Sequence, residues 1–176
     1  MTEPLIPPLA TSISVSPSAP GDYWALLPCA GTGSRAVAAD AHASAPGLPK
    51  QYHLVAGQPM VLHTLAAFAG VNRLRGTLVA VAPGDHFLDA YANPSFFTVD
   101  CGGPTRAATV QGGIKTLLER GADRDDWVLV HDAARCLVTA EQIDRLIDAC
   151  VSDSVGGLLA HQLADTLKTS IDGPGG

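Results

Sequence analysis

Five basic residues of this acidic chain stand in glycine-rich loops or directly after apolar runs. They are Arg35, Lys50, Arg106, Arg135 and Lys168. The formal net charge of the chain is −6, so its cations are scarce and their placement is informative. Cations at the ends of buried strands favour the binding of a small anion, whereas solvent-facing loop charges are the ordinary alternative. Lys50 follows Pro49, which stiffens the approach to the amine, and a lysine is a compact point charge suited to phosphate.

A glycine loop interrupts the apolar stretch LLPCAGTGSRAV at residues 26–37. Gly31 and Gly33 allow backbone N–H groups to approach a phosphate without a side chain in the way. The spacing Gly31-x-Gly33-x-x-Ala36 also fits the relaxed dinucleotide-binding pattern. That pattern requires an acidic residue about 20 residues further on. Residues 51–57 read QYHLVAG and contain no acid, which disfavours a nicotinamide-dependent oxidoreductase.

An aspartate and an arginine follow the apolar run in WVLVHDAAR, residues 127–135. Asp132 at the end of a buried strand is a reasonable Mg²⁺ ligand, because Mg²⁺ usually takes one or two carboxylates together with substrate phosphates. The alternative is that Asp132 only stabilises the turn after the strand. Arg135 either holds a phosphate or fixes the loop through a carboxylate.

A fourth polar segment is CGGPTRAATV, residues 101–110. Arg106 and Thr109 lie three residues apart on the first turns of an expected helix, so one face offers a guanidinium and a hydroxyl. The alternative is an ordinary helix start with Thr105 as its N-cap.

Apolar runs and amphipathic segments alternate along the chain, and they must position these groups. Strands are expected at 23–28, 77–83 and 127–131, with weaker candidates at 96–100 and 157–161. Helices are expected at 59–69, 105–120 and 139–151. This order predicts an α/β fold, with a mostly parallel sheet and helices on both faces. The loops after the three stronger strands should meet at the carboxyl edge of the sheet, where ligands bind in such folds.

Length and composition limit the class of protein. The chain has 176 residues and 47% hydrophobic content, which suits one domain with a sizeable core. Residues 1–21 are rich in Pro and Ser and hold no Lys or Arg, so they predict a tail rather than a secretory signal. No apolar run is long enough to cross a membrane. The four cysteines form no C-x-x-C pair, which favours reduced thiols in the cytoplasm, and the negative charge argues against a nucleic-acid partner.

Taken together, these segments resemble the 2-C-methyl-D-erythritol 4-phosphate cytidylyltransferase family. The resemblance rests on PCAGTGSR, PKQY, APGD, GGPTRAATVQGGI, VLVHDAAR and GGLLAHQLADTLK, in that order, and covers residues 24–169. It implies a Rossmann-like domain of the nucleotide-diphospho-sugar transferase type at 22–172, with short tails at 1–21 and 173–176. The implied activity is transfer of CMP from CTP to 2-C-methyl-D-erythritol 4-phosphate with release of pyrophosphate, in isoprenoid precursor synthesis.

The resemblance also implies a role for individual residues. Arg35 and Lys50 would be catalytic, and Asp132 would hold Mg²⁺ beside the substrate. The nucleotide would be held by Ala30, Gly31, Gly33, Gly84, Asp85, Arg106 and Thr109. Arg135 and Thr166 would face the methylerythritol phosphate.

Members of the family continue well past the ADTLK segment, with an arm exchanged between the two subunits of a homodimer. This chain stops at TSIDGPGG. We therefore expect a formed CTP half-site, an incomplete methylerythritol half-site and no basis for a stable dimer. Two alternatives stay open: a CTP-binding protein without turnover, and a related cytidylyltransferase that acts on ribitol 5-phosphate.

Overall fold

The computed structural model describes residues 21–31 and 48–161. Its centre is a four-stranded sheet in which all neighbouring strands are parallel, in the order β5-β4-β1-β6. The strands are β1 (Tyr23–Pro28), β4 (Leu74–Ala80), β5 (Phe97–Val99) and β6 (Trp127–Val130). Of the tails expected at 1–21 and 173–176, residues 1–20 and 173–176 lie outside the described residues. Gly21, assigned to the first tail, already packs against the backbone of Asp125.

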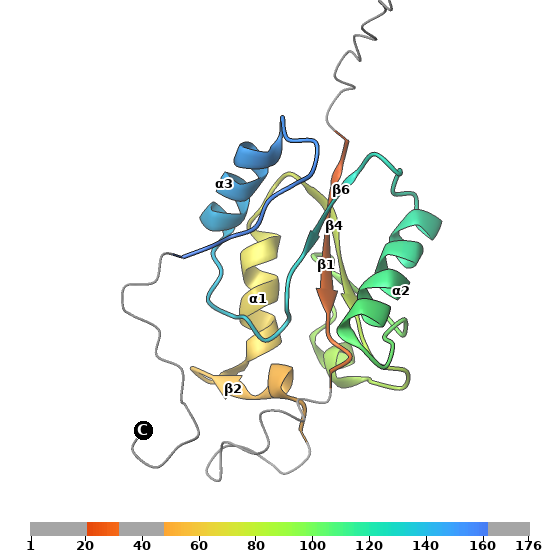
Figure 1. Ribbon diagram of the computed structural model, residues 1–176. Helices are drawn as coiled ribbons and strands as arrows, with labels where there is room; N and C mark the ends of the chain where they lie inside the picture. Colours follow the sequence, from red (N-terminus) through yellow and green to blue (C-terminus); the bar gives the residue numbers. More distant parts are fainter. Residues whose placement is uncertain (1–20, 32–47, 162–176) are drawn as a thin grey trace, which may run out of the picture.

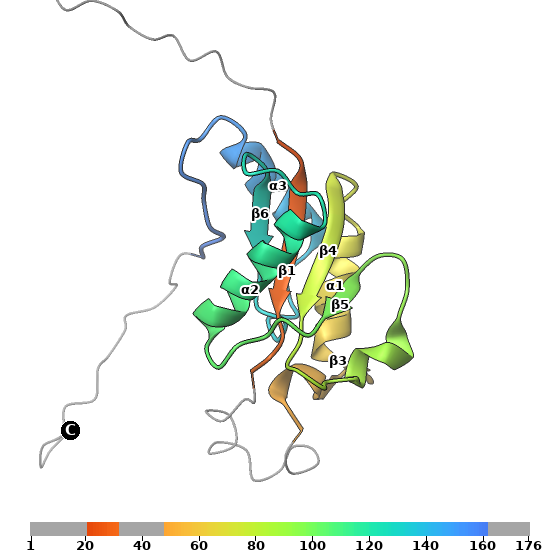
Figure 2. The same cartoon turned by 90° about the vertical axis from the view of Figure 1, so that its right-hand side faces the viewer.

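Helices cover both faces of the sheet, as predicted (Figures 1 and 2). Helices α1 (Met60–Ala69) and α3 (Ala140–Cys150) lie on one face, and α2 (Arg106–Glu119) lies on the other. Alternate residues of β1 serve the two cores: Ala25 and Leu27 pack with α1 and α3, whereas Leu26 packs with Leu117 of α2. This alternation follows from the two-residue period of a strand, and it explains why β1 is apolar throughout.

Local capping sets the helix boundaries close to those expected. The Thr105 side chain accepts a hydrogen bond from Ala108 N and begins α2. Thr139 and Gln142 form both bonds of the predicted capping box at the start of α3. Gly121 has a φ of 98°, the left-handed conformation that ends a helix, and it follows Arg120, the C-cap of α2.

Two strand predictions need correction. The strand expected at 77–83 runs instead from Leu74 to Ala80, because β1 pairs along its whole length and Tyr23 lies opposite Leu74. The start of this strand was missed because Gly76 is not typical of a strand interior. In the structure Gly76 lies against the Trp24 ring, where a larger side chain would be crowded. Residues 157–161 form no strand. Within the described ranges no ladder partner lies beside them, and Leu158 is 78% exposed.

Four small elements were not predicted. Strands β2 (Leu54–Val55) and β3 (Gln58–Pro59) form a hairpin, and η1 (Lys50–Tyr52) and η2 (Phe87–Tyr91) are 3-10 turns. Elements of two to five residues carry too little periodicity to be read from sequence.

Within the described part of the chain, no helix has the length and apolar character needed to cross a membrane. All four cysteines are free thiols, in agreement with the expected reduced state.

Candidate active site at the carboxyl edge of the sheet

The loops that follow three strands of the sheet converge at its carboxyl edge (Figure 2). Cys29 N donates to Ala80 O at 2.8 Å, which joins the exits of β1 and β4. His131 N donates to Leu26 O at 3.1 Å and brings the exit of β6 beside β1. The predicted meeting of these loops at one edge is therefore confirmed.

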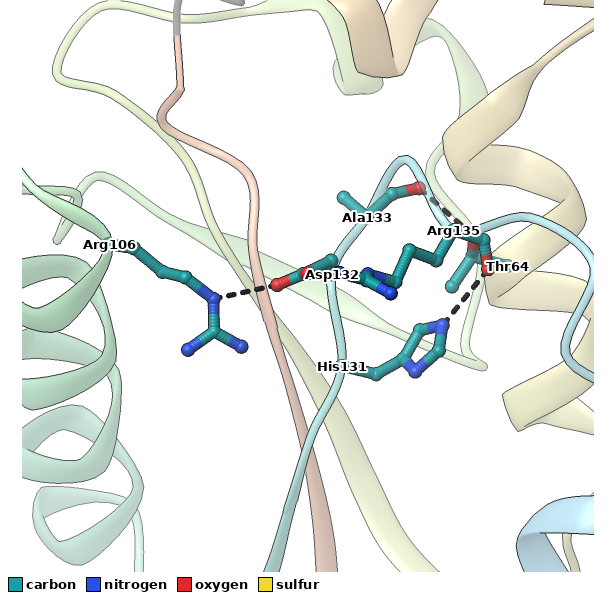
Figure 3. Close-up of polar contacts among 6 residues, drawn as sticks. All are labelled: Thr64, Arg106, His131, Asp132, Ala133 and Arg135. Carbon is teal, nitrogen blue, oxygen red and sulfur yellow. Dashed lines mark hydrogen bonds and ion pairs between the residues drawn. The ribbon is translucent and has the colours of Figure 1, made fainter. Parts of the chain in front are cut away.

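Asp132 lies between two arginines from different elements (Figure 3). Arg106 Nε of α2 donates to Asp132 Oδ1 at 2.7 Å, and Arg135 Nε donates to Oδ2 at 2.8 Å. Partial burial of Asp132 alone would raise the pKa of its carboxyl group. The hydrogen bonds and charges of the two guanidinium groups outweigh that effect and lower the pKa below its ordinary value. The carboxylate is thus ionised at neutral pH and links α2 to the loop after β6.

That loop is held by further bonds from both sides (Figure 3). Arg135 N donates to Asp132 O at 2.9 Å, which closes the turn, and His131 Nε2 lies 3.0 Å from Arg135 O. Thr64 of α1 donates its buried hydroxyl to Ala133 O at 3.0 Å. The turn interpretation of Asp132 is therefore confirmed, and both oxygens of its side chain bind arginines. Its contact with Mg²⁺ stays a prediction.

Lys50 belongs to the same cavity as this cluster. It is the first residue of η1, its side chain is exposed, and it lines an open cavity of about 1130 Å³ together with Arg106, Asp132 and Arg135. The lining of the cavity extends from the carboxyl edge along β6, from Trp127 to Val130. Three separate segments, at residues 50, 106 and 135, thus contribute cations to one space.

The glycine loops pack closely beneath this edge. Gly102 lies so near Ala30 and the backbone of Val81 that any side chain there would collide with both. Thr109 is 3% exposed, and its hydroxyl accepts from Gly103 N at 3.0 Å and donates to Thr105 O at 3.0 Å. The hydroxyl therefore shapes the glycine loop from within, and its assigned contact with a nucleotide stays a prediction.

The APGD segment forms a tight turn. Asp85 N donates to Ala82 O, and Gly84 has a φ of 77°, which a type II turn requires at its third position. Asp85 Oδ2 accepts from the Tyr52 hydroxyl at 2.6 Å, and Oδ1 accepts from Phe87 N at 3.0 Å. Both carboxylate oxygens already bind protein groups, so this turn has a structural explanation, and the predicted nucleotide contacts of Gly84 and Asp85 remain untested.

Gly33, Arg35, Thr166 and Lys168 lie outside the described residues. Gly31, at the end of the first described segment, is exposed beside the carboxyl edge. One residue that the sequence analysis passed over is Gln51, whose buried amide binds the backbone around Gly31. Its position between Lys50 and a tyrosine was visible in PKQY, but neither period nor composition predicts a side-chain bond to a loop twenty residues earlier.

Among the described residues that line the cavity, Asp132 is the carboxylate, and it is therefore the candidate metal ligand there. No group of three or more potential metal ligands occurs within residues 21–31 and 48–161. An ionised carboxylate has about four lone-pair directions, and the two arginines use two of them. Asp132 therefore fits Mg²⁺ of the kind that takes one carboxylate and completes its shell with substrate phosphates and water.

Comparison with known proteins places this geometry in a family. Residues 23–173 match the family model described as IspD, 2-C-methyl-D-erythritol 4-phosphate cytidylyltransferase. A bifunctional enzyme IspD/IspF of Albidiferax ferrireducens is 60% identical over 147 residues, covering 82% of this chain and 33% of the relative. The 2-C-methyl-D-erythritol 4-phosphate cytidylyltransferase of Paraburkholderia phymatum is 46% identical over 147 residues, covering 82% of this chain and 59% of the relative.

A crystal structure of 4-diphosphocytidyl-2C-methyl-D-erythritol synthase superposes with a TM-score of 0.72 at 36% identity, over 89% of this chain and 67% of the other. The chain spans between a third and three fifths of the length of the two curated relatives just described. The family model covers the sheet, its helices and the cation-lined cavity alike. The chain therefore belongs to the 2-C-methyl-D-erythritol 4-phosphate cytidylyltransferase family.

Proposed function

We propose that this chain binds CTP at the carboxyl edge of its sheet and transfers CMP to 2-C-methyl-D-erythritol 4-phosphate, with release of pyrophosphate. One observation carries the proposal: Lys50 and the Arg106–Asp132–Arg135 cluster line one cavity in a chain of this family. The product would serve isoprenoid precursor synthesis.

In the proposed reaction, a phosphate oxygen of methylerythritol phosphate attacks the α-phosphorus of CTP. A new P–O bond forms, the bond between the α- and β-phosphates breaks, and pyrophosphate carries away the electron pair. Negative charge grows on the oxygens around the α-phosphorus and on the leaving group, so catalysis depends on positioning and on cations fixed in place beforehand.

Lys50 is our candidate for the cation that faces this charge, with Arg35 as its partner by family resemblance. An exposed ammonium on a short anchored turn places a point charge at the cavity wall. A unit charge about 4 Å from a phosphate oxygen contributes about 4 kcal/mol at an effective dielectric constant near 20. Two such cations would offset much of the charge that develops in the transition state.

Arg106 and Arg135 offer a second cationic wall. Each uses its Nε on Asp132, and no other bond to a side-chain nitrogen of either arginine occurs among residues 21–31 and 48–161. The terminal nitrogens are therefore directed by Asp132 and remain able to grip a phosphate in a forked geometry. We assign Arg135, together with Thr166, to the methylerythritol phosphate, and Arg106 to the nucleotide side.

Asp132 would hold Mg²⁺ when CTP is bound, and the metal would neutralise and orient the triphosphate oxygens. The same carboxylate fixes the two arginines, so its removal should loosen the whole second wall of the cavity. The backbone of Ala30, Gly31 and Gly33 would then cradle the nucleotide. Gly84, Asp85 and Thr109 complete the proposed pocket, shaping it from within through the bonds described above.

The proposal is tested by incubating the protein with CTP, Mg²⁺ and one alcohol phosphate at a time, while released pyrophosphate is measured. Release with methylerythritol phosphate and not with ribitol 5-phosphate is expected. Release with ribitol 5-phosphate alone would refute the substrate. Calorimetric binding of CTP without any release would reduce the function to nucleotide binding, and absence of CTP binding would refute the proposal altogether.

A further inference from the structure

Gln51 is a buried amide between two functional segments. It is the middle residue of η1, and it is 6% exposed, whereas its neighbour Lys50 faces the cavity. A glutamine amide carries two N–H donors, and leaving them unmet in the interior costs free energy. The partners of this amide therefore show what the side chain is for.

Both partners lie on the segment that leaves β1. Gln51 Nε2 donates to Cys29 O at 2.9 Å and to Gly31 O at 3.0 Å, one hydrogen for each carbonyl. Strand β1 ends at Pro28, and the next residue still pairs with β4, because Cys29 N donates to Ala80 O. The amide thus binds two alternate carbonyls of an extended backbone, as a neighbouring strand would, at the place where strand pairing stops.

The turn that carries Gln51 is itself fixed. Tyr52 N donates to Pro49 O, and His53 N donates to Lys50 O, so the turn is closed on both sides of Gln51. The Tyr52 hydroxyl then binds Asp85 on the far side of the turn. Lys50 is the only residue of η1 whose side chain is exposed, and its backbone is tied to the β1 exit through Gln51.

We propose that Gln51 is a positioning residue that holds the backbone at Gly31 and the ammonium of Lys50 in a fixed relation across the cavity. The inference rests on the proposed function for the role of Lys50, and it adds a residue that touches neither substrate. A misplacement of about 1 Å at a reacting centre lowers a rate by about a hundredfold, so this tie is expected to act on the transfer step.

The chemistry of the site specifies glutamine. Glutamate has the same shape, but when ionised it cannot donate and it repels the two carbonyl oxygens. Methionine has similar length, donates nothing and carries no charge. The exposed Gln58 of β3 offers a matched control, because Gln58→Glu makes the same chemical change away from the cavity.

The test compares Gln51→Glu and Gln51→Met with Gln58→Glu at temperatures well below unfolding. At pH 8 we expect both Gln51 variants to lose about a hundredfold in kcat while the Kd of CTP changes about fivefold or less. On lowering the pH, Gln51→Glu should regain activity relative to wild type, because a protonated carboxyl again donates one hydrogen bond, whereas Gln51→Met should not. A folded Gln51→Met protein with wild-type kcat would overturn the inference, since a merely stabilising side chain leaves kcat intact.

A second readout needs no substrate. Cys29 is 1% exposed, and burial, with a smaller contribution from the Asp85 charge, raises its pKa to about 12. Its alkylation therefore reports opening of the β1 exit, and Cys101 provides the internal comparison. Loss of the two bonds should speed the labelling of Cys29 by about tenfold or more in either variant. Unchanged labelling of Cys29 would refute the tie even if turnover fell, and accelerated labelling would support it even if wild type proved inactive with CTP.

Discussion

Replacement of Tyr52 by phenylalanine tests whether the APGD turn is structural. The Tyr52 hydroxyl donates to Asp85 Oδ2 at 2.6 Å and lies 3.7 Å from the thiol of Cys29. Phenylalanine keeps the ring, which stacks on Phe87 at a centroid distance of 3.9 Å. The change therefore removes the short hydrogen bond to the Asp85 carboxylate and the weaker bond from the Cys29 thiol, and it leaves the packing in place.

The expected loss follows from the surroundings of the bond to Asp85. Hydrogen bonds to charged groups contribute about 1.5–3 kcal/mol. Asp85 is half-buried and keeps its bond from Phe87 N, so water can partly replace the lost donor and the lower half of the range applies. We expect the free energy of unfolding to fall by about 2 kcal/mol, which corresponds to a drop of about 4–8 °C in Tm for a domain of this size.

The pH dependence of stability provides a second test, because the direction of the expected change is known. Burial, followed by the nearby Cys29 and Asp85, raises the pKa of the Tyr52 hydroxyl above its ordinary value of 10.0. In the unfolded chain this hydroxyl ionises near pH 10, whereas in the folded protein it stays neutral. The stability that it contributes is therefore complete below pH 10 and declines as the pH rises above it. The gap between wild type and Tyr52→Phe should be constant to about pH 9 and then shrink.

Urea unfolding followed by circular dichroism measures these differences. Tyr91→Phe is the matched control, since Tyr91 is 40% exposed and its hydroxyl makes no bond within the described ranges. A double-mutant cycle with Asp85→Asn should give a coupling energy of about 1–2 kcal/mol. Stability of Tyr52→Phe within about 0.5 kcal/mol of wild type at pH 7.5 would refute the structural account and return Asp85 to its nucleotide role.

Three further outcomes are expected. Lys50→Ala should raise the barrier to transfer by about 2.7–4 kcal/mol, while the affinity for CTP falls less. If the variant turns over as fast as the wild type in a coupled pyrophosphate assay, Lys50 has no part in the mechanism. Asp132→Asn should weaken the Mg²⁺ dependence of turnover. The variant should also be less stable than the wild type, because Arg106 and Arg135 are held less firmly. This difference in the free energy of unfolding should be constant above about pH 4 and shrink at lower pH, where the wild-type carboxyl becomes protonated. Thr139→Ala should cost about 1 kcal/mol in urea unfolding by deleting the α3 cap, and an unchanged midpoint would contradict that cap.

The sequence predicted those parts of the fold that depend on local pattern. The apolar run at 23–28 became β1 with the expected bounds, and Thr139 and Gln142 formed the expected capping box. Residues 157–161 show the limit of this reasoning. A run such as GLLAH has strand character, but a strand exists only where another strand pairs with it, and pairing is a property of the tertiary structure.

The candidate site was predictable in its residue types and less so in its bonds. Asp132, Arg106 and Lys50 were recognised because each follows or opens a regular element, and the parallel sheet brings such positions to one edge. That Asp132 binds both arginines could not be read from spacing, because Arg106 lies 26 residues before it on another element. The role of Gln51 was not predicted either, because its partners are backbone carbonyls, and no residue pattern in the sequence indicates such bonds.

The charge balance of the cluster supports the proposed binding of a triphosphate by an acidic chain. Asp132 pairs with two guanidinium groups, so the cluster keeps one net positive charge, and Lys50 adds a second at the same cavity. The overall charge of −6 acts from greater distances, and salt screens it beyond about 8–10 Å, so the cations at the cavity wall dominate the local field. Asp132 thus fixes two flexible arginines in position and cancels only one of their two charges, so a net positive field remains for the proposed anionic substrate.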